Sequence, residues 1–287
     1  MQIEKWVSPK TLPELQEILS SKKESDYFIN GGTDLMVALK AGKYVAGVID
    51  LTHLKELCEI KQNPHSLFIG GGLTYDDIAK NDIVCFHFPA LAKAASMVGS
   101  QQIRNRGTMA GSVANASPAG DIFPVLCCLQ AAVKLFDSNG SITAIPISDF
   151  VVNAGKTILQ NNQCILGFDI PVGLWQKTAY IKLGSRSQVT IAQMTATMAL
   201  SLCKDEIIKC NLTVGSIGTK PVCLQPTEQL FLGKNSHELT EKTFLEAAEM
   251  YAEYIRVNVP KEFDRDYKAV AVIGVFEDLF SELVLQN

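Results

Sequence analysis

The sequence lacks the features that would direct this chain to a membrane or to nucleic acid. No apolar run reaches the roughly 20 residues of a membrane span. The N-terminus has no signal-peptide pattern, so we expect a cytoplasmic protein. The 26 basic and 30 acidic residues give a net charge of −4, which disfavours nucleic acid and anionic membranes as main partners. Internal repeats, low-complexity tracts and runs of like charge are also absent.

Metal-ligand spacing is absent as well. The eight cysteines form no C-x-x-C pair and no C-x₄-C-x₂-C iron–sulfur spacing, and the four histidines are equally scattered. Dispersed, mostly apolar cysteines are typical of proteins in a reducing cytosol. The pair Cys127 and Cys128 lies inside an apolar run, which indicates core packing. We therefore expect no metal site on this chain.

A stretch of small residues from Gln101 to Asp121, QQIRNRGTMAGSVANASPAGD, is the most distinctive part of the sequence. Between Thr108 and Asp121 the only large apolar side chains are Met109 and Val113, so we expect a loop here and not a helix or a core strand. Backbone N–H groups exposed in such a loop form a cavity suited to a phosphate. The alternative is a tight, glycine-rich turn selected for packing. Asp121 could accept from a ribose hydroxyl or cap a helix.

A second glycine motif lies in residues 27–39, YFINGGTDLMVAL. A short apolar strand at 27–29 is expected to stop at Asn30, Gly31 and Gly32, and a helix is expected at 33–41. A strand followed by a glycine pair and a helix points N–H groups at a phosphate. The three spaced glycines of the dinucleotide fingerprint are missing. Two separate glycine loops favour a diphosphate held between two parts of the chain.

The pattern of strands, helices and turns divides the chain into three units of an α+β fold, at 1–53, 54–177 and 178–287. The glycines at 70–72 follow a strand, and we interpret them as a structural turn. The expected strands are 45–51, 131–136, 141–147, 163–170, 179–183, 191–203 and 207–217. The expected helices are 75–80, 89–97, 122–129, 238–256 and 264–285, and the apolar stripes of the last two indicate core packing.

With both motifs in view, the chain resembles the FAD-binding (medium) subunits of the xanthine dehydrogenase and carbon monoxide dehydrogenase family, the molybdenum hydroxylases. The matching segments are INGGTDL at 29–35, QIRNRGT at 102–108 and ASPAGD at 116–121. The resemblance covers nearly the whole chain. One departure is that Ala110, Gly111 and Ser112 stand where the family usually has two glycines and an asparagine. An alanine is tolerated there only if its φ is negative.

The resemblance implies a PCMH-type two-part FAD-binding fold followed by a C-terminal antiparallel sheet with helices, as in CO dehydrogenase flavoproteins. It places the pyrophosphate of FAD between the loops 30–34 and 108–112. The implied cofactor-binding set is Phe28, Ile29, Asn30, Gly31, Gly32, Thr33, Asp34, Leu35, Val98, Thr108, Ala110, Gly111, Ser112, Ser117, Asp121, Ile165, Lys182 and Ile191.

Four of these positions carry particular roles by resemblance. Asp121 is expected at the ribose or neighbouring polar atoms, Ile165 on the adenine side, and Ile191 against the isoalloxazine ring. Lys182 matches a lysine near the flavin, where a cation stabilises the anionic reduced ring; the alternative is a solvated lysine at a strand edge. No catalytic residue is expected, because the flavin carries the redox chemistry.

The function implied by the resemblance is that of an oxidoreductase subunit in a hetero-oligomer. A molybdopterin-binding large subunit and a 2Fe-2S small subunit would be its partners, and NAD⁺ or another acceptor would receive the electrons. Two alternatives stay open at this point. The chain could be a stand-alone FAD-dependent reductase of the same broad fold, or a non-catalytic assembly subunit that has lost flavin.

Overall fold

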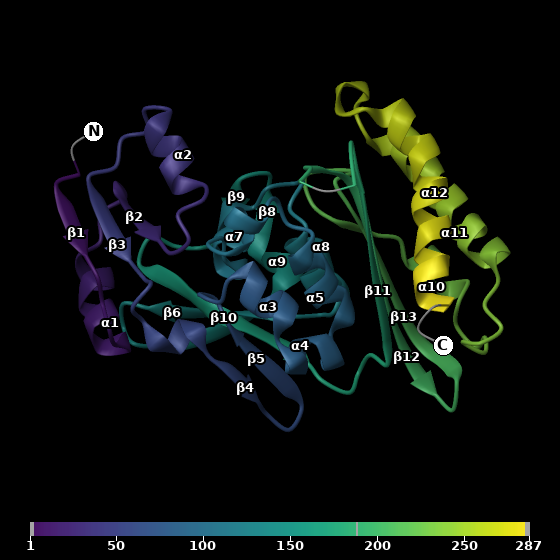
Figure 1. Cartoon of the computed structure of the whole chain (residues 1–287), viewed down its shortest axis with the longest axis horizontal. Coiled ribbons are helices and arrows are strands. Elements are labelled where there is room, and N and C mark those ends of the chain that lie inside the picture. The colour runs from purple at the N-terminus through teal and green to yellow at the C-terminus, as the bar shows by residue number, and fades with distance from the viewer. Residues whose placement is uncertain (1–2, 188, 285–287) are drawn as a thin grey trace.

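The computed structural model describes residues 3–187 and 189–284, which form a row of sheets with helices between them (Figure 1). Residue 285, the last of the expected helix 264–285, lies outside the described residues. Within them, no helix is both long and apolar enough to cross a membrane. The expected helices and strands are present, and their ends fall within three residues of those observed. The three-unit division of the chain stays a prediction.

The N-terminal part is a small parallel sheet with one helix between each pair of strands in the sequence. The strand order is β1-β3-β2. The strands are β1 Lys5–Val7, β2 Asp26–Ile29 and β3 Gly47–Asp50, and the helices are α1 Leu12–Ser21 and α2 Leu35–Lys40. The first glycine loop joins β2 to α2, so it leaves the carboxyl end of a strand and leads directly into a helix.

The middle of the chain is an antiparallel sheet of order β4-β5-β10-β6-β7, beside which short helices pack. The strands are β4 Ile60–Gln62, β5 Ser66–Gly70, β6 Ala132–Asp137, β7 Ile142–Pro146 and β10 Gln163–Pro171, with a separate pair β8 Val151–Asn153 and β9 Lys156–Thr157. The helices are η1 Lys55–Cys58, α3 Tyr75–Lys80, α4 Asp82–His87, α5 Pro89–Ser96, α6 Gln101–Arg104, α7 Met109–Asn115, α8 Ile122–Cys128 and α9 Ile147–Phe150.

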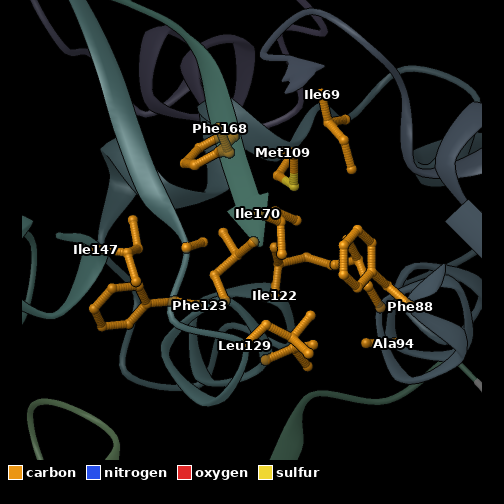
Figure 2. Close-up of a cluster of buried hydrophobic side chains, with 14 of the residues drawn as sticks. Ile69, Phe88, Ala94, Met109, Ile122, Phe123, Leu129, Ile147, Phe168 and Ile170 are labelled. Atoms are coloured by element: carbon orange, nitrogen blue, oxygen red, sulfur yellow. The ribbon is translucent and has the colours of Figure 1, made fainter. Parts of the chain in front are cut away.

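A buried cluster fixes these helices on the sheet (Figure 2). Ile69 and Phe168 come from adjacent strands, and Met109, Ile122 and Phe88 come from three different helices or their ends. Burial of such side chains is the main favourable contribution to folding, at about 25 cal/mol per Å² of apolar surface. The helix ends around the second glycine loop are therefore held by the core below them.

The C-terminal part is a four-stranded antiparallel sheet in the order β11-β12-β13-β14, with helices on both faces (Figure 1). Helix α12 packs on one face, and α5 and α8 of the middle part pack against β11, β12 and β13. The elements are β11 Lys177–Gly184, β12 Ala192–Cys203, β13 Glu206–Gly215, β14 Val222–Cys223, α10 Gln225–Gln229, α11 Glu241–Asn258, η2 Lys261–Phe263 and α12 Arg265–Val284. The sheet thus joins the middle part to the long helices.

The small-residue stretch is not the continuous loop that its composition predicts, and that prediction is wrong. It contains the two helices α6 and α7. The side chain of Thr108 accepts a hydrogen bond from the N–H of Gly111 at 3.2 Å and caps α7. Met109 and Val113, four residues apart on one face, are fully buried. Two apolar residues at helical spacing and one cap are enough here, because the core supplies the packing.

Candidate functional site

The two glycine loops meet at one cavity of about 500 Å³. Gly32 from the first loop and Gly111 from the second both line it. Thirteen of the eighteen expected cofactor-binding residues are in its wall: Phe28, Ile29, Asn30, Gly31, Gly32, Thr33, Asp34, Leu35, Thr108, Ala110, Gly111, Ser112 and Ile165. The fold therefore brings together two bends that are far apart in the sequence.

The first loop presents unused backbone donors at this cavity. Gly32 has φ +73°, a left-handed conformation that glycine adopts without strain. Within the described part of the chain, the N–H groups of Gly31, Gly32, Thr33 and Asp34 donate no hydrogen bond to another protein atom. Four consecutive free donors are suited to the oxygens of an anion such as a phosphate.

A direct contact of main chains holds the two loops together. A Cβ atom added to Gly31 would overlap the carbonyl group of Arg106, so only glycine allows this approach. Across the same junction, the Asn115 side-chain amide donates to a carboxylate oxygen of Asp34 at 3.5 Å. The spacing between the loops is therefore set by backbone contact.

The family departure at Ala110 is accommodated by a glycine elsewhere. Ala110 lies in α7 and is not among the non-glycine residues with positive φ, so the backbone condition for an alanine is met. A Cβ added to Gly71 would lie 2.7 Å from the Cβ of Ala110, well inside contact distance. The N–H of Ala110 also donates to the carbonyl of Gly71 at 3.3 Å. The absence of a side chain at 71 thus makes room for the one at 110.

The interpretation of residues 70–72 as a structural turn did not predict that Gly71 leaves space for Ala110 at the cavity. Gly71 and Tyr75 line the cavity as well. The signal was available, because these glycines begin at the last residue of β5 and precede α3, which repeats the strand–glycine–helix pattern of the first loop. Other lining residues without such a signal are Tyr27, Ala38, Lys43, Leu51, Leu57, Ala114, Asn115, Gly155, Leu159 and Cys164.

The other five expected residues lie outside the cavity wall. Ser117 and Ile191 are exposed, the latter at 77 %, and Val98 is half-buried. Asp121 is buried and makes no side-chain cap for α8. It instead accepts hydrogen bonds from the Tyr180 hydroxyl at 2.7 Å and the Lys182 ammonium at 2.8 Å.

Lys182 is a buried lysine, and the alternative of a solvated strand-edge position is wrong. Its side chain is 2 % exposed, and its ammonium also donates to the carbonyl of Met97 at 3.0 Å. Tyr180 and Lys182 are alternate residues of β11, so both side chains reach Asp121 from the same face of the strand. Burial raises the pKa of Asp121, and the charge of Lys182 and the hydrogen bonds from Lys182 and Tyr180 oppose that rise.

Comparison with known proteins gives a consistent result along the whole chain. Residues 1–173 match the family model of the FAD binding domain in molybdopterin dehydrogenase, and residues 179–283 match that of the CO dehydrogenase flavoprotein C-terminal domain. The glyceraldehyde dehydrogenase medium chain of Sulfolobus acidocaldarius is 30 % identical, over 78 % of this chain and 80 % of its own. The nicotinate dehydrogenase FAD-subunit of Eubacterium barkeri is 29 % identical, over 98 % and 96 %.

Solved structures share the fold. The structure of quinoline 2-oxidoreductase from Pseudomonas putida 86 contains a chain with a TM-score of 0.89 at 21 % identity, covering 100 % of this chain and 99 % of that one. A chain of the carbon monoxide dehydrogenase of Hydrogenophaga pseudoflava has a TM-score of 0.87 at 21 % identity, covering 98 % and 97 %. The expected α+β architecture, a two-part FAD-binding fold with a C-terminal sheet-and-helix domain, is confirmed.

Removing one partner of the buried ion pair should destabilise the fold strongly. We expect Lys182→Met or Asp121→Asn to lower the free energy of unfolding by about 3–5 kcal/mol, because each leaves an uncompensated charge or an unpaired polar group in the interior. The double variant should lose less than the two single losses together. Denaturant unfolding measures all three.

The control is the exposed pair of Lys242 and Glu246 in α11. Lys242→Met should cost only about 0–1 kcal/mol. The assignment of a coupled buried pair would be contradicted if the single variants at 121 and 182 lose as little free energy of unfolding as the control. It would also be contradicted if the loss in the double variant equals the sum of the two single losses.

The contact between residues 71 and 110 gives a second prediction. We expect Gly71→Ala to cost about 1–3 kcal/mol through overpacking against Ala110. Adding Ala110→Gly should restore much of that loss, although Ala110→Gly alone costs about 1 kcal/mol in helix propensity. Thermal unfolding of the two single variants and the double variant tests this. Gly274→Ala, where the added Cβ meets nothing within 4 Å, is the control; no rescue in the double variant would show that the two sites are independent.

Proposed function

Because the chain belongs to the family of FAD-binding subunits of molybdopterin dehydrogenases, we propose that it is the electron-transfer subunit of a xanthine dehydrogenase-like complex. It is an oxidoreductase subunit with FAD as its cofactor. The observation that carries the proposal is the meeting of two glycine loops on one cavity, where the first loop has four N–H groups that are free within the described part of the chain. Consecutive free N–H groups of this kind are suited to the oxygens of a phosphate.

The cavity fits a nucleotide cofactor in size and in chemistry. Its volume of about 500 Å³ falls inside the usual range for small-molecule and cofactor sites, roughly 300–1,000 Å³. Its wall combines apolar side chains such as Phe28 and Ile165 with the backbone donors of the first loop. This mixture suits a ligand with an aromatic base at one end and a charged linker in the middle.

We assign the pyrophosphate to the first loop, Asn30 to Asp34, and to the second, Thr108 to Ser112. The N–H groups of the first loop donate to phosphate oxygens, and the Thr33 hydroxyl adds another donor. Gly32 supports this geometry through its left-handed backbone. In this assignment Ile165 packs on the adenine side.

Of the five residues outside the cavity wall, Asp121 is assigned to the ribose or neighbouring polar atoms of the cofactor, and Lys182 and Ile191 are assigned to the flavin. Asp121, Lys182 and Val98 belong to one neighbourhood, because Lys182 bonds both to Asp121 and to the residue before Val98. Ser117 and Ile191 are both exposed. Since the charge of Lys182 is paired with Asp121, the pair acts on its surroundings as an oriented dipole and not as a net cation.

FAD supplies the redox chemistry when bound, because a flavin takes up electrons singly and releases them as a pair. The chain's own residues bind and orient it. We propose that electrons arrive from 2Fe-2S clusters on a small partner subunit, that a large partner subunit holds molybdopterin, and that NAD⁺ or another acceptor receives the electrons. All eight cysteines are free, which supports our placement of the complex in the reducing cytoplasm.

Blocking the first loop should abolish cofactor retention. We expect Gly32→Val to lose FAD while the rest of the fold persists, because a branched side chain is strained at φ +73° and crowds Ile29. Flavin absorbance per chain after gel filtration measures retention.

The matched control is Gly233→Val, at a glycine with φ +74° and no heavy atom within 4 Å of its added Cβ. In this variant a valine adopts the same left-handed backbone conformation, at a position far from the cavity residues in the sequence. The variant should therefore retain FAD. Stoichiometric FAD in Gly32→Val would remove the first loop from the site.

Isolation from the native cell tests the place of the chain in a complex. We expect a tagged chain to co-purify with molybdenum and iron in fixed ratio to flavin, because the metals belong to its partners. Elemental analysis of the complex on a size-exclusion column measures this. A chain that elutes alone with FAD and reduces an organic substrate with NADH would instead be a stand-alone reductase.

A further inference from the structure

Tyr75 lies directly beneath the second glycine loop. Its backbone N–H donates to the carbonyl of Gly107 at 3.0 Å, and its neighbour Thr74 forms an isolated β-bridge with Thr108. Thr74 and Asp77 form a complete capping box, which fixes the first turn of α3. The main chain at Tyr75 is therefore joined to the start of the loop and cannot move independently of it.

The ring of Tyr75 packs against the loop's main chain. A Cβ added to Gly107 would lie 2.7 Å from Cε2 of Tyr75, closer than any real side chain allows. Gly107 does not have positive φ, so its backbone conformation alone does not require glycine. The close approach of the ring explains why a glycine stands at 107.

Tyr75 shares the cavity wall with residues of both loops. Tyr75 is 6 % exposed and is part of the cavity wall. Ser112 of the second loop and Asp34 of the first line the same cavity, and both influence the pKa of the Tyr75 hydroxyl. Burial raises the pKa of Tyr75 to about 12, so at neutral pH it is an uncharged hydroxyl.

Resting on the proposed function, we propose that Tyr75 is a positioning residue for the cofactor's diphosphate. It sets where the loop 108–112 lies through the contact of its ring with Gly107 and of its hydroxyl with Ser112. The part of the cavity wall that this loop forms is then in place before the cofactor enters, so less order has to be imposed on binding. The chemistry of the site assigns Tyr75 no proton transfer and no charge.

If Tyr75 only stabilises the core, its replacement should have a different effect on FAD binding. Tyr75 belongs to the same buried cluster as Ile69 and Met109, and an aromatic ring there stabilises the core whatever the cavity holds. In that case its replacement would lower stability but would leave the affinity of the folded chain for FAD unchanged. Affinity and stability must therefore be measured separately.

The test uses the full chain stripped of flavin and titrated with FAD by fluorescence. We expect Tyr75→Phe to raise the dissociation constant about 2- to 10-fold, as for loss of one hydrogen bond. Tyr75→Leu should raise it roughly tenfold further, because the loop is no longer held. Tyr267→Leu, at a half-exposed tyrosine of α12, is the matched control and should bind as wild type.

A spectroscopic signature separates positioning from packing. The two phosphorus NMR signals of bound FAD should shift in both Tyr75 variants and stay in place in Tyr267→Leu. If Tyr75→Leu does not fold, the cycle of Tyr75→Phe with Ser112→Ala decides. Positioning through Ser112 requires the double variant to lose less affinity than the product of the two single effects.

Two failures are distinguishable. A wild-type chain that binds no FAD overturns the proposed function and this inference with it. A wild-type chain that binds FAD, with Tyr75 variants of unchanged affinity and phosphorus spectrum, overturns only the role of Tyr75.

Discussion

The site depends on one steric constraint, the contact of the main chain at Gly31 with the carbonyl group of Arg106. The first loop follows a strand of the N-terminal sheet, whereas the second lies at the start of α7 in the middle part of the chain. Their approach is possible because residue 31 has no Cβ. This approach places the free N–H groups of the first loop and the second loop at the same cavity. The glycines are thus needed for contact between loops as well as for their backbone angles.

Around this contact, the residue size that is tolerated at one position depends on the residue at a neighbouring position. Ala110 replaces a glycine usual in the family, and the space for its methyl group comes from Gly71 on another loop. The ring of Tyr75 similarly occupies the space that Gly107 leaves. Three segments, the loops at 30–34, 70–75 and 107–112, therefore behave as one packed unit in which the size of one residue limits another. A substitution in any of them has to be judged with its neighbours.

Features formed by residues close together in the sequence could be predicted, whereas most features formed by contacts between distant segments could not. The first loop was predictable because a strand, a glycine pair and a helix start are consecutive residues. Helix α7 was missed because its stability comes from burial of Met109 and Val113 in a core that only the tertiary fold creates. The burial of Lys182 was equally invisible, since its partner Asp121 is 61 residues away. The contact between Gly71 and Ala110 likewise joins segments that sequence periodicity does not relate.

The pairing of Asp121 with two side chains of β11 has a consequence for how this protein can evolve. Asp121 ends the segment that begins at the second loop, whereas Tyr180 and Lys182 lie in the part that matches a separate family model. Recombination that replaced the C-terminal module by an unrelated one would leave the buried carboxyl group of Asp121 without its hydrogen-bond and ion-pair partners. The two modules must therefore be inherited together, or exchanged only for versions that supply the same hydroxyl and ammonium groups.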